Sequence, residues 1–152
     1  MEPHGRWYRR VFVVAGVAMV LLVAQYLLGM WTNVYAPSTP AFYAMKNYTP
    51  LGLHVFNGDA LFLLAVVALI FAAFSWQLRL IVPAAALAIA ILVGGELGMA
   101  FENSVNPIYS FGMGTMWMVA FFATGVLLWG SWGLGNASMA PPSTRVSGSP
   151  SG

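Results

Sequence analysis

Four polar side chains lie at a common depth in otherwise apolar segments, and two of them are carboxylates. Gln25, Asp59, Glu96 and Thr115 each stand about five residues inside the same end of a different segment. At about 1.5 Å of rise per helical residue, all four lie roughly 6 to 8 Å below one membrane edge. A carboxylate inside a span costs at least about 2.5 kcal/mol. We therefore predict a catalytic role for Asp59 and Glu96 in proton transfer, in which one holds a proton that the other accepts.

A simpler role for these two carboxyl groups is also compatible with the sequence. They could hydrogen-bond Gln25, Asn57 or Thr115 and hold the helices together, at about 0.6 to 2 kcal/mol per bond. The first role requires Asp59 and Glu96 to reach one cavity, together with His54. The second requires only neighbouring helices.

His54 has the residue type and the surroundings of a cofactor ligand. Asn57 and Gly58 continue its helical face at the i+3 and i+4 positions, and the glycine leaves room for a flat macrocycle. Haem iron accepts histidine and methionine as axial ligands. We therefore predict that His54 is the metal ligand of a haem and that Met113 or Met116 supplies the opposite ligand. Methionines in membrane helices also serve packing, and a single histidine near an interface also contacts headgroups or loops.

These residues must be positioned by membrane-spanning helices. Of the 152 residues 60% are hydrophobic and 7% are charged, whereas a soluble domain carries roughly 25% charged residues. Segments of about 20 apolar residues are long enough to cross a hydrocarbon core. The fold class predicted is an all-α integral membrane protein, a four-helix transmembrane bundle in one domain over residues 1–132. The expected spans are 11–30, 54–74, 80–100 and 111–132.

The charged residues predict the orientation of these helices. Only residues 75–79 separate the second span from the third, so these two helices should form a tight antiparallel hairpin. The arginines then fall on one side and Lys46 on the other, which makes both termini cytoplasmic by the positive-inside rule. The membrane expected is the cytoplasmic membrane of a prokaryote. Residues 133–152, rich in Ser, Gly and Pro, should form a disordered cytoplasmic tail.

A repeated phrase suggests how the four helices are related. Leu28-Gly29-Met30 and Leu97-Gly98-Met99 each close an apolar run, so the chain reads as two helical hairpins in parallel repeat. The interface between such repeats commonly holds a ligand. The long connection over residues 31–53 carries Tyr35, Phe42, Tyr43 and Tyr48, which form either a lid or contacts with the lipid interface.

Two stretches of the first hairpin resemble a known family. The end of the first span, Gln25–Thr32, and the start of the second, His54–Leu61, are similar to one four-helix half of the haem A synthases. The resemblance implies that Gln25 and Gly29 line a pocket and that His54 ligates haem. Ser110 and Met113 stand where that family has its other histidine, and the chain has no cysteine, so a retained haem or quinone pocket is implied rather than haem A synthesis. The chain also resembles small four-helix membrane proteins of bacteria and archaea.

Two classes of function follow from these patterns. The first is a redox-associated protein that binds haem or a quinone near the outer surface through His54, Gln25, Asn57, Gly58, Met113 and Met116. The second is a noncatalytic accessory or assembly subunit of a larger membrane complex, in which Gly94, Gly95 and Gly98 let helices pack closely. The expected partners are the lipid bilayer and other membrane subunits or further copies of the chain. Six scattered basic residues argue against nucleic acid.

Overall fold

The chain folds into four long helices. The computed structural model describes residues 5–35 and 48–139, and within them the elements are α1 (Gly5–Tyr35), α3 (Thr49–Phe74), α4 (Leu78–Ser104) and α5 (Pro107–Met139). No strand occurs in this part of the chain. All four helices are long and apolar enough to cross a membrane. The prediction of an all-helical fold with four helices that could span a membrane is therefore confirmed for the described residues.

Every helix continues about one turn beyond its expected span at the same end of the bundle. Helix α1 ends at Tyr35 and α4 at Ser104, while α3 begins at Thr49 and α5 at Pro107. Proline is well suited to a first helical turn because the amide it lacks would have no partner there. Helix α5 also continues past Trp132 to Met139, into the segment predicted as a tail. Residues 140–152 and two of the predicted lid aromatics, Phe42 and Tyr43, lie outside the described residues.

Short turns join the helices within the second half of the chain. Between α3 and α4, Trp76 adopts a left-handed backbone conformation (φ 56°), and the hydroxyl of Ser75 donates to the carbonyl of Ala72 at 2.6 Å. Between α4 and α5, Val105 has φ 53° and its amide donates to the carbonyl of Phe101. The tight antiparallel connection predicted between the second and third spans is thus confirmed.

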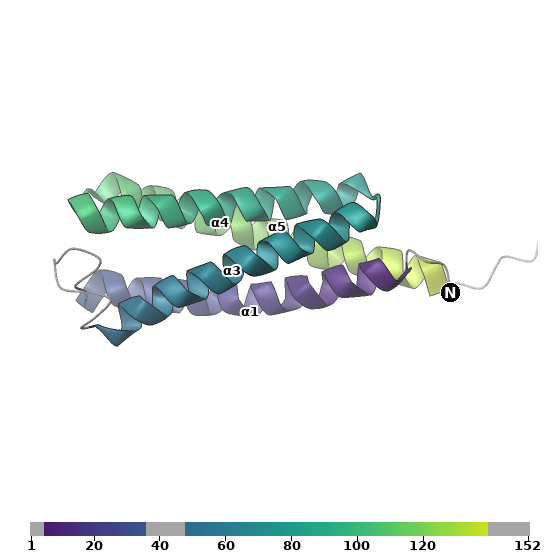
Figure 1. Cartoon of the computed structure of the whole chain (residues 1–152), viewed down its shortest axis with the longest axis horizontal. Coiled ribbons are helices and arrows are strands. Elements are labelled where there is room, and N and C mark those ends of the chain that lie inside the picture. The colour runs from purple at the N-terminus through teal and green to yellow at the C-terminus, as the bar shows by residue number, and fades with distance from the viewer. Residues whose placement is uncertain (1–4, 36–47, 140–152) are drawn as a thin grey trace, which may run out of the picture.

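The helices are arranged as a ring rather than as a row. Helix α1 packs against α3 and α5, and α4 packs against the same two helices. Among the described residues the backbones of α1 and α4 do not approach each other closely, nor do those of α3 and α5, so these pairs lie on the diagonals. In Figure 1, α3 runs close to α1 at its N-terminal end and reaches α4 near the turn that joins them. We call the end at this turn the closed end, and the end where α1 and α4 finish the open end.

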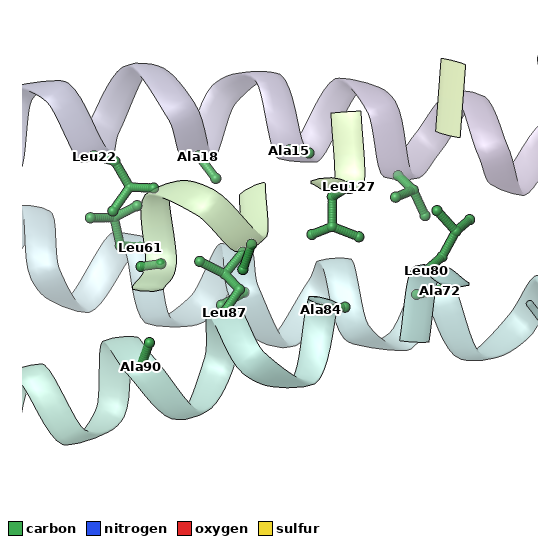
Figure 2. Close-up of a cluster of buried hydrophobic side chains, with 14 of the residues drawn as sticks. Ala15, Ala18, Leu22, Leu61, Ala72, Leu80, Ala84, Leu87, Ala90 and Leu127 are labelled. Carbon is green, nitrogen blue, oxygen red and sulfur yellow. The ribbon is translucent and has the colours of Figure 1, made fainter. Parts of the chain in front are cut away.

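Small residues fill much of the space between the helices. Figure 2 shows Ala15 and Ala18 of α1, Ala72 of α3 and Ala84 of α4 directed toward a common interior. Leucines from α3, α4 and α5 complete this cluster. In lipid, helix association depends largely on close packing, which alanine permits because its side chain keeps the backbones near one another. The core therefore closes the middle and the closed end of the bundle.

Candidate functional site

A cavity of about 540 Å³ lies at the open end and receives side chains from all four helices. This volume falls within the range of about 300 to 1,000 Å³ that is typical of small-molecule sites. Most of the predicted site residues line it: Gln25, His54, Gly58, Asp59, Glu96 and Met113. His54, Asp59 and Glu96 therefore reach one cavity, as the proposed proton-transfer role requires.

The polar side chains of the α1–α3 pair form a connected hydrogen-bond network. The side-chain amide of Asn57 donates to the backbone carbonyl of Leu21 at 3.0 Å and to Oε1 of Gln25 at 2.6 Å. The Nε2 atom of Gln25 lies 3.3 Å from Nε2 of His54. Asn57 and His54 are three residues apart on α3, which puts both on the face directed at α1. The network thus joins the two helices of the first hairpin.

The direction of these hydrogen bonds fixes the form of the imidazole. A carbonyl such as that of Leu21 can only accept, so the Asn57 atom facing it is the amide nitrogen. The same nitrogen donates to Gln25, which leaves Nε2 of Gln25 as the donor to His54. In neutral histidine the accepting Nε2 carries no proton, and the proton resides on Nδ1. The network therefore selects the Nδ1-protonated tautomer of His54.

The imidazole of His54 packs against α1 at Gly29 and also lines the cavity. A Cβ added at Gly29 would be 3.1 Å from Cε1 of His54 and 3.7 Å from Nδ1. A Cβ at this position would push the ring a few tenths of an ångström away from α1. The Nδ1 atom is buried and has no hydrogen-bond partner within the described part of the chain.

This placement bears on the predicted role of His54 as a metal ligand. His54 and Met113 both line the cavity, so side chains of the types that ligate haem iron are present. The lone pair of Nε2 is directed at Gln25, however, and iron at this atom would have to displace that hydrogen bond. A ligand that only accepts or donates hydrogen bonds can use the site as it stands. No group of three or more metal-ligating side chains occurs in residues 5–35 and 48–139.

The two carboxylates line the cavity but take no part in the hydrogen-bond network. Asp59 and Glu96 are both exposed, and within residues 5–35 and 48–139 neither makes a hydrogen bond or an ion pair. The partners suggested for an interhelical role are otherwise engaged. Gln25 and Asn57 bond to each other, and the hydroxyl of Thr115 donates to the carbonyl of Phe111 in its own helix. The carboxyl groups are therefore open to exchange protons with whatever enters the cavity.

Two predicted cofactor contacts have a packing position in the structure. Asn57 is buried and is not among the residues that line the cavity, so it positions Gln25 instead of facing a ligand. Met116 does not line the cavity either, and its Cβ would lie 3.4 Å from a Cβ at Gly94. The sulfur of Met113 packs in the same way on Gly98, at 3.3 Å from a Cβ at that position. Both methionines thus fill the space that glycines of α4 leave toward α5.

The sequence did not indicate the aromatic wall of the cavity or its third carboxylate. The rings of Tyr26 and Trp117 lie 4.9 Å apart, and Phe121 stacks on Trp117 at 5.3 Å. The indole Nε1 of Trp117 donates to the carbonyl of Leu22 at 2.9 Å. A tryptophan this far inside a span, away from the interfacial belt, is the one signal that could have pointed to this wall. Glu102 also lines the cavity, close to the end of α4.

Comparison with known proteins leaves the site to be interpreted from its own geometry, because no protein-family model, curated protein or solved structure matches the chain significantly.

Proposed function

We propose that the cavity at the open end binds a redox-active ring, a quinone in preference to a haem, and that the protein is a small redox-associated membrane protein. The observation that carries the proposal is the joint lining of one cavity by His54, Asp59 and Glu96, with Gln25 bonded to His54. A quinone carbonyl needs a hydrogen-bond donor. The second hydrogen of the Gln25 amide nitrogen can serve as one without loss of the bond to His54.

Some residues of the site would bind the ring, and others would exchange protons with it. Trp117 and Tyr26 give the cavity an aromatic surface that a flat ring can contact. A bound quinone would supply redox chemistry that takes up two electrons and two protons per quinol formed. Asp59 and Glu96 would exchange these protons with the water beyond the open end. The electrons would come from a partner protein that carries a redox-active metal centre.

We also propose that the open end faces the outside of a prokaryotic cytoplasmic membrane and that the two hairpins are parallel repeats. At the closed end, the guanidinium of Arg10 lies 4.6 Å from the centre of the Trp7 ring, which itself stacks on Phe74 at 5.0 Å. Arginine beside tryptophan is typical of a cytoplasmic interface. The diagonal placement of α1 and α4 is the one that a two-fold axis along the membrane normal produces.

Quinone binding can be tested by the fluorescence of Trp117. The protein would be reconstituted in phosphatidylcholine nanodiscs and titrated with a ubiquinone that has a short isoprenoid tail. Quinones quench nearby indoles, so we expect a saturable component of quenching that disappears in Trp117→Phe. Gln25→Ala should weaken binding by about fivefold, the equivalent of one hydrogen bond of about 1 kcal/mol. Quenching that rises linearly with quinone in both proteins would contradict the proposal, because it reports only collisions in the lipid.

The absorption spectrum separates the two ligands. A Soret band in the purified protein that vanishes in His54→Ala would identify haem as the ligand and would require His54 to leave Gln25. A colourless protein that binds no quinone and copurifies with other membrane proteins would instead favour an accessory subunit. The contacts of Gly94 and Gly98 with methionines of α5 are the packing that this alternative expects.

A further inference from the structure

The two sides of the cavity differ in the size of the residues that close them. On the side between α1 and α5, the rings of Tyr26 and Trp117 meet at 4.9 Å, and the indole is held by its hydrogen bond to the carbonyl of Leu22. Bulky rings in direct contact leave little room for a ligand to pass. At the depth of these two rings this side of the cavity is closed, although Tyr26 is itself 47% exposed.

The side between α3 and α4 is lined by a glycine and by side chains that are exposed at the bundle surface. Gly94 and Gly98 face α5, where they meet Met116 and Met113. Gly95 is turned about 100° from Gly94 around the helix, is exposed, and has no atom within 4 Å of the position that a Cβ would take. Leu92 and Met99 flank it on α4 with 51% and 55% of their surface exposed, although both line the cavity.

Helix α3 contributes a matching apolar border. Val55 and Phe62 line the cavity and are each more than a third exposed. Figure 1 shows α3 turning away from α4 toward the open end, where it approaches α1. Residues that belong both to a cavity and to the outer surface mark an opening. Because α3 and α4 are membrane-spanning in length and composition, the apolar residues at this opening border hydrocarbon.

We propose that the gap between α3 and α4 beside Gly95 is a lateral portal through which a quinone with an isoprenoid tail enters from the bilayer. This inference rests on the proposed function. The ring passes Gly95 and reaches Gln25, while the tail stays between the apolar borders formed by Val55, Phe62, Leu92 and Met99. Asp59 and Glu96 stand at the same opening, one on each helix. A tail longer than the cavity needs an apolar exit, and the lipid-facing gap supplies one.

The portal can be narrowed without disturbing the core. Gly95→Phe places a ring where a Cβ meets nothing, so it should obstruct the gap while the bundle stays folded. Gly125→Phe is the matched control: a Cβ at Gly125 also meets nothing within 4 Å, and this glycine does not line the cavity. Both variants make the same change in a helix, so their thermal stabilities in detergent should agree.

The experiment compares two quinones in nanodiscs by the saturable quenching of Trp117. For a ubiquinone with a long isoprenoid tail, we expect Gly95→Phe to weaken binding by about tenfold, the effect of overpacking by roughly 1.4 kcal/mol, and Gly125→Phe to leave it unchanged. A tail-less benzoquinone, which can enter from the water at the open end, should be affected less than about threefold. Equal binding of the tailed quinone by both variants, or equal loss of both quinones in Gly95→Phe, would overturn the portal and leave the binding site standing. Absence of saturable quenching in the wild-type protein would overturn the binding site and the portal together.

Discussion

The closed end and the open end of the bundle contain the same four helices but different side chains between them. At the closed end alanines and leucines such as Ala72, Ala84 and Leu80 are fully buried, and none of them lines the cavity of the open end. At the open end glycines and polar side chains take their place, and a cavity of about 540 Å³ opens. The difference shows that close packing requires side chains from different helices to match. At the open end such matches join α1 to α3, α1 to α5 and α4 to α5, and they leave the cavity between them.

The largest loss of stability is expected when a buried side chain is truncated in the tightly packed closed end. Leu80 is fully buried, and its Cδ2 lies 3.1 Å from where a Cβ at Gly130 would be. Leu80→Ala should lower the free energy of unfolding by about 2 to 5 kcal/mol, because the neighbouring helices cannot collapse into the void. The measurement is unfolding in mixed detergent micelles, followed by circular dichroism.

The same substitution at the open end provides the comparison. Leu92 lines the existing cavity and is half exposed, so Leu92→Ala should change the free energy of unfolding by no more than about 0.5 kcal/mol. If the two variants lost equal stability, the open end would be as tightly packed as the closed end, and the contrast between them would be wrong.

A smaller loss of stability is expected when the side-chain hydrogen bonds between α1 and α3 at the open end are removed. Asn57 donates hydrogen bonds to both Leu21 and Gln25 of α1, and Asn57→Ala removes these two hydrogen bonds between α1 and α3. At about 0.6 kcal/mol per bond inside a membrane, with a maximum near 1.7, the expected cost is about 1 to 2 kcal/mol. The same micelle unfolding measures it, and a double-mutant cycle with Gln25→Ala should show coupling because the two side chains share a bond.

Thr115→Val is the control for the loss of the hydrogen bonds that Asn57 makes to α1. Its hydroxyl bonds only to the carbonyl of Phe111 in the same helix and is exposed, so its removal should leave stability nearly unchanged. Independent, additive effects of Asn57→Ala and Gln25→Ala would show that the network does not join α1 to α3.

The sequence predicted the helices, and which residues line the cavity, better than it predicted the contacts between those residues. Long apolar runs and the short 75–79 connection sufficed for four helices and a tight turn, because both depend on local composition. Of the four residues predicted at a common depth, Gln25, Asp59 and Glu96 line the cavity and Thr115 does not, since counting residues along a helix gives depth but not direction.

The direction in which each side chain points around its helix could not be predicted in the same way. The helices are apolar on all sides, with exposed residues such as Phe111 and Leu63 larger and no less apolar than buried Ala65 and Ala120. A periodic pattern therefore does not mark the buried face, and only helix packing decides that His54 meets Gln25 while Met116 meets Gly94. The Tyr26–Trp117 pair was missed for this reason, as its members lie on helices far apart in the chain.

The smallest change in stability is expected for alanine substitutions at Gly29 and Gly98, the two glycines of the repeated Leu-Gly-Met sequence. A Cβ at Gly29 would lie 3.1 Å from the imidazole of His54, and one at Gly98 would lie 3.3 Å from the sulfur of Met113. Methionine is flexible and can move aside, whereas the imidazole is held by Gln25. Gly98→Ala should therefore be neutral or gain up to about 1 kcal/mol from the better helix former, while Gly29→Ala should lose about 1 kcal/mol as the His54–Gln25 bond is strained.

Nitrogen NMR of the imidazole gives this last comparison a readout beyond stability. In the wild-type protein Nδ1 of His54 should carry the proton and Nε2 should resonate as an unprotonated acceptor, because Gln25 donates to it. Gly29→Ala should shift the Nε2 signal, and Gly98→Ala should not, since Met113 belongs to the other hairpin. Equal shifts in both variants would mean that the two hairpins respond as one unit. The tautomer of His54 would then depend on the whole open end and not on the α1–α3 pair alone.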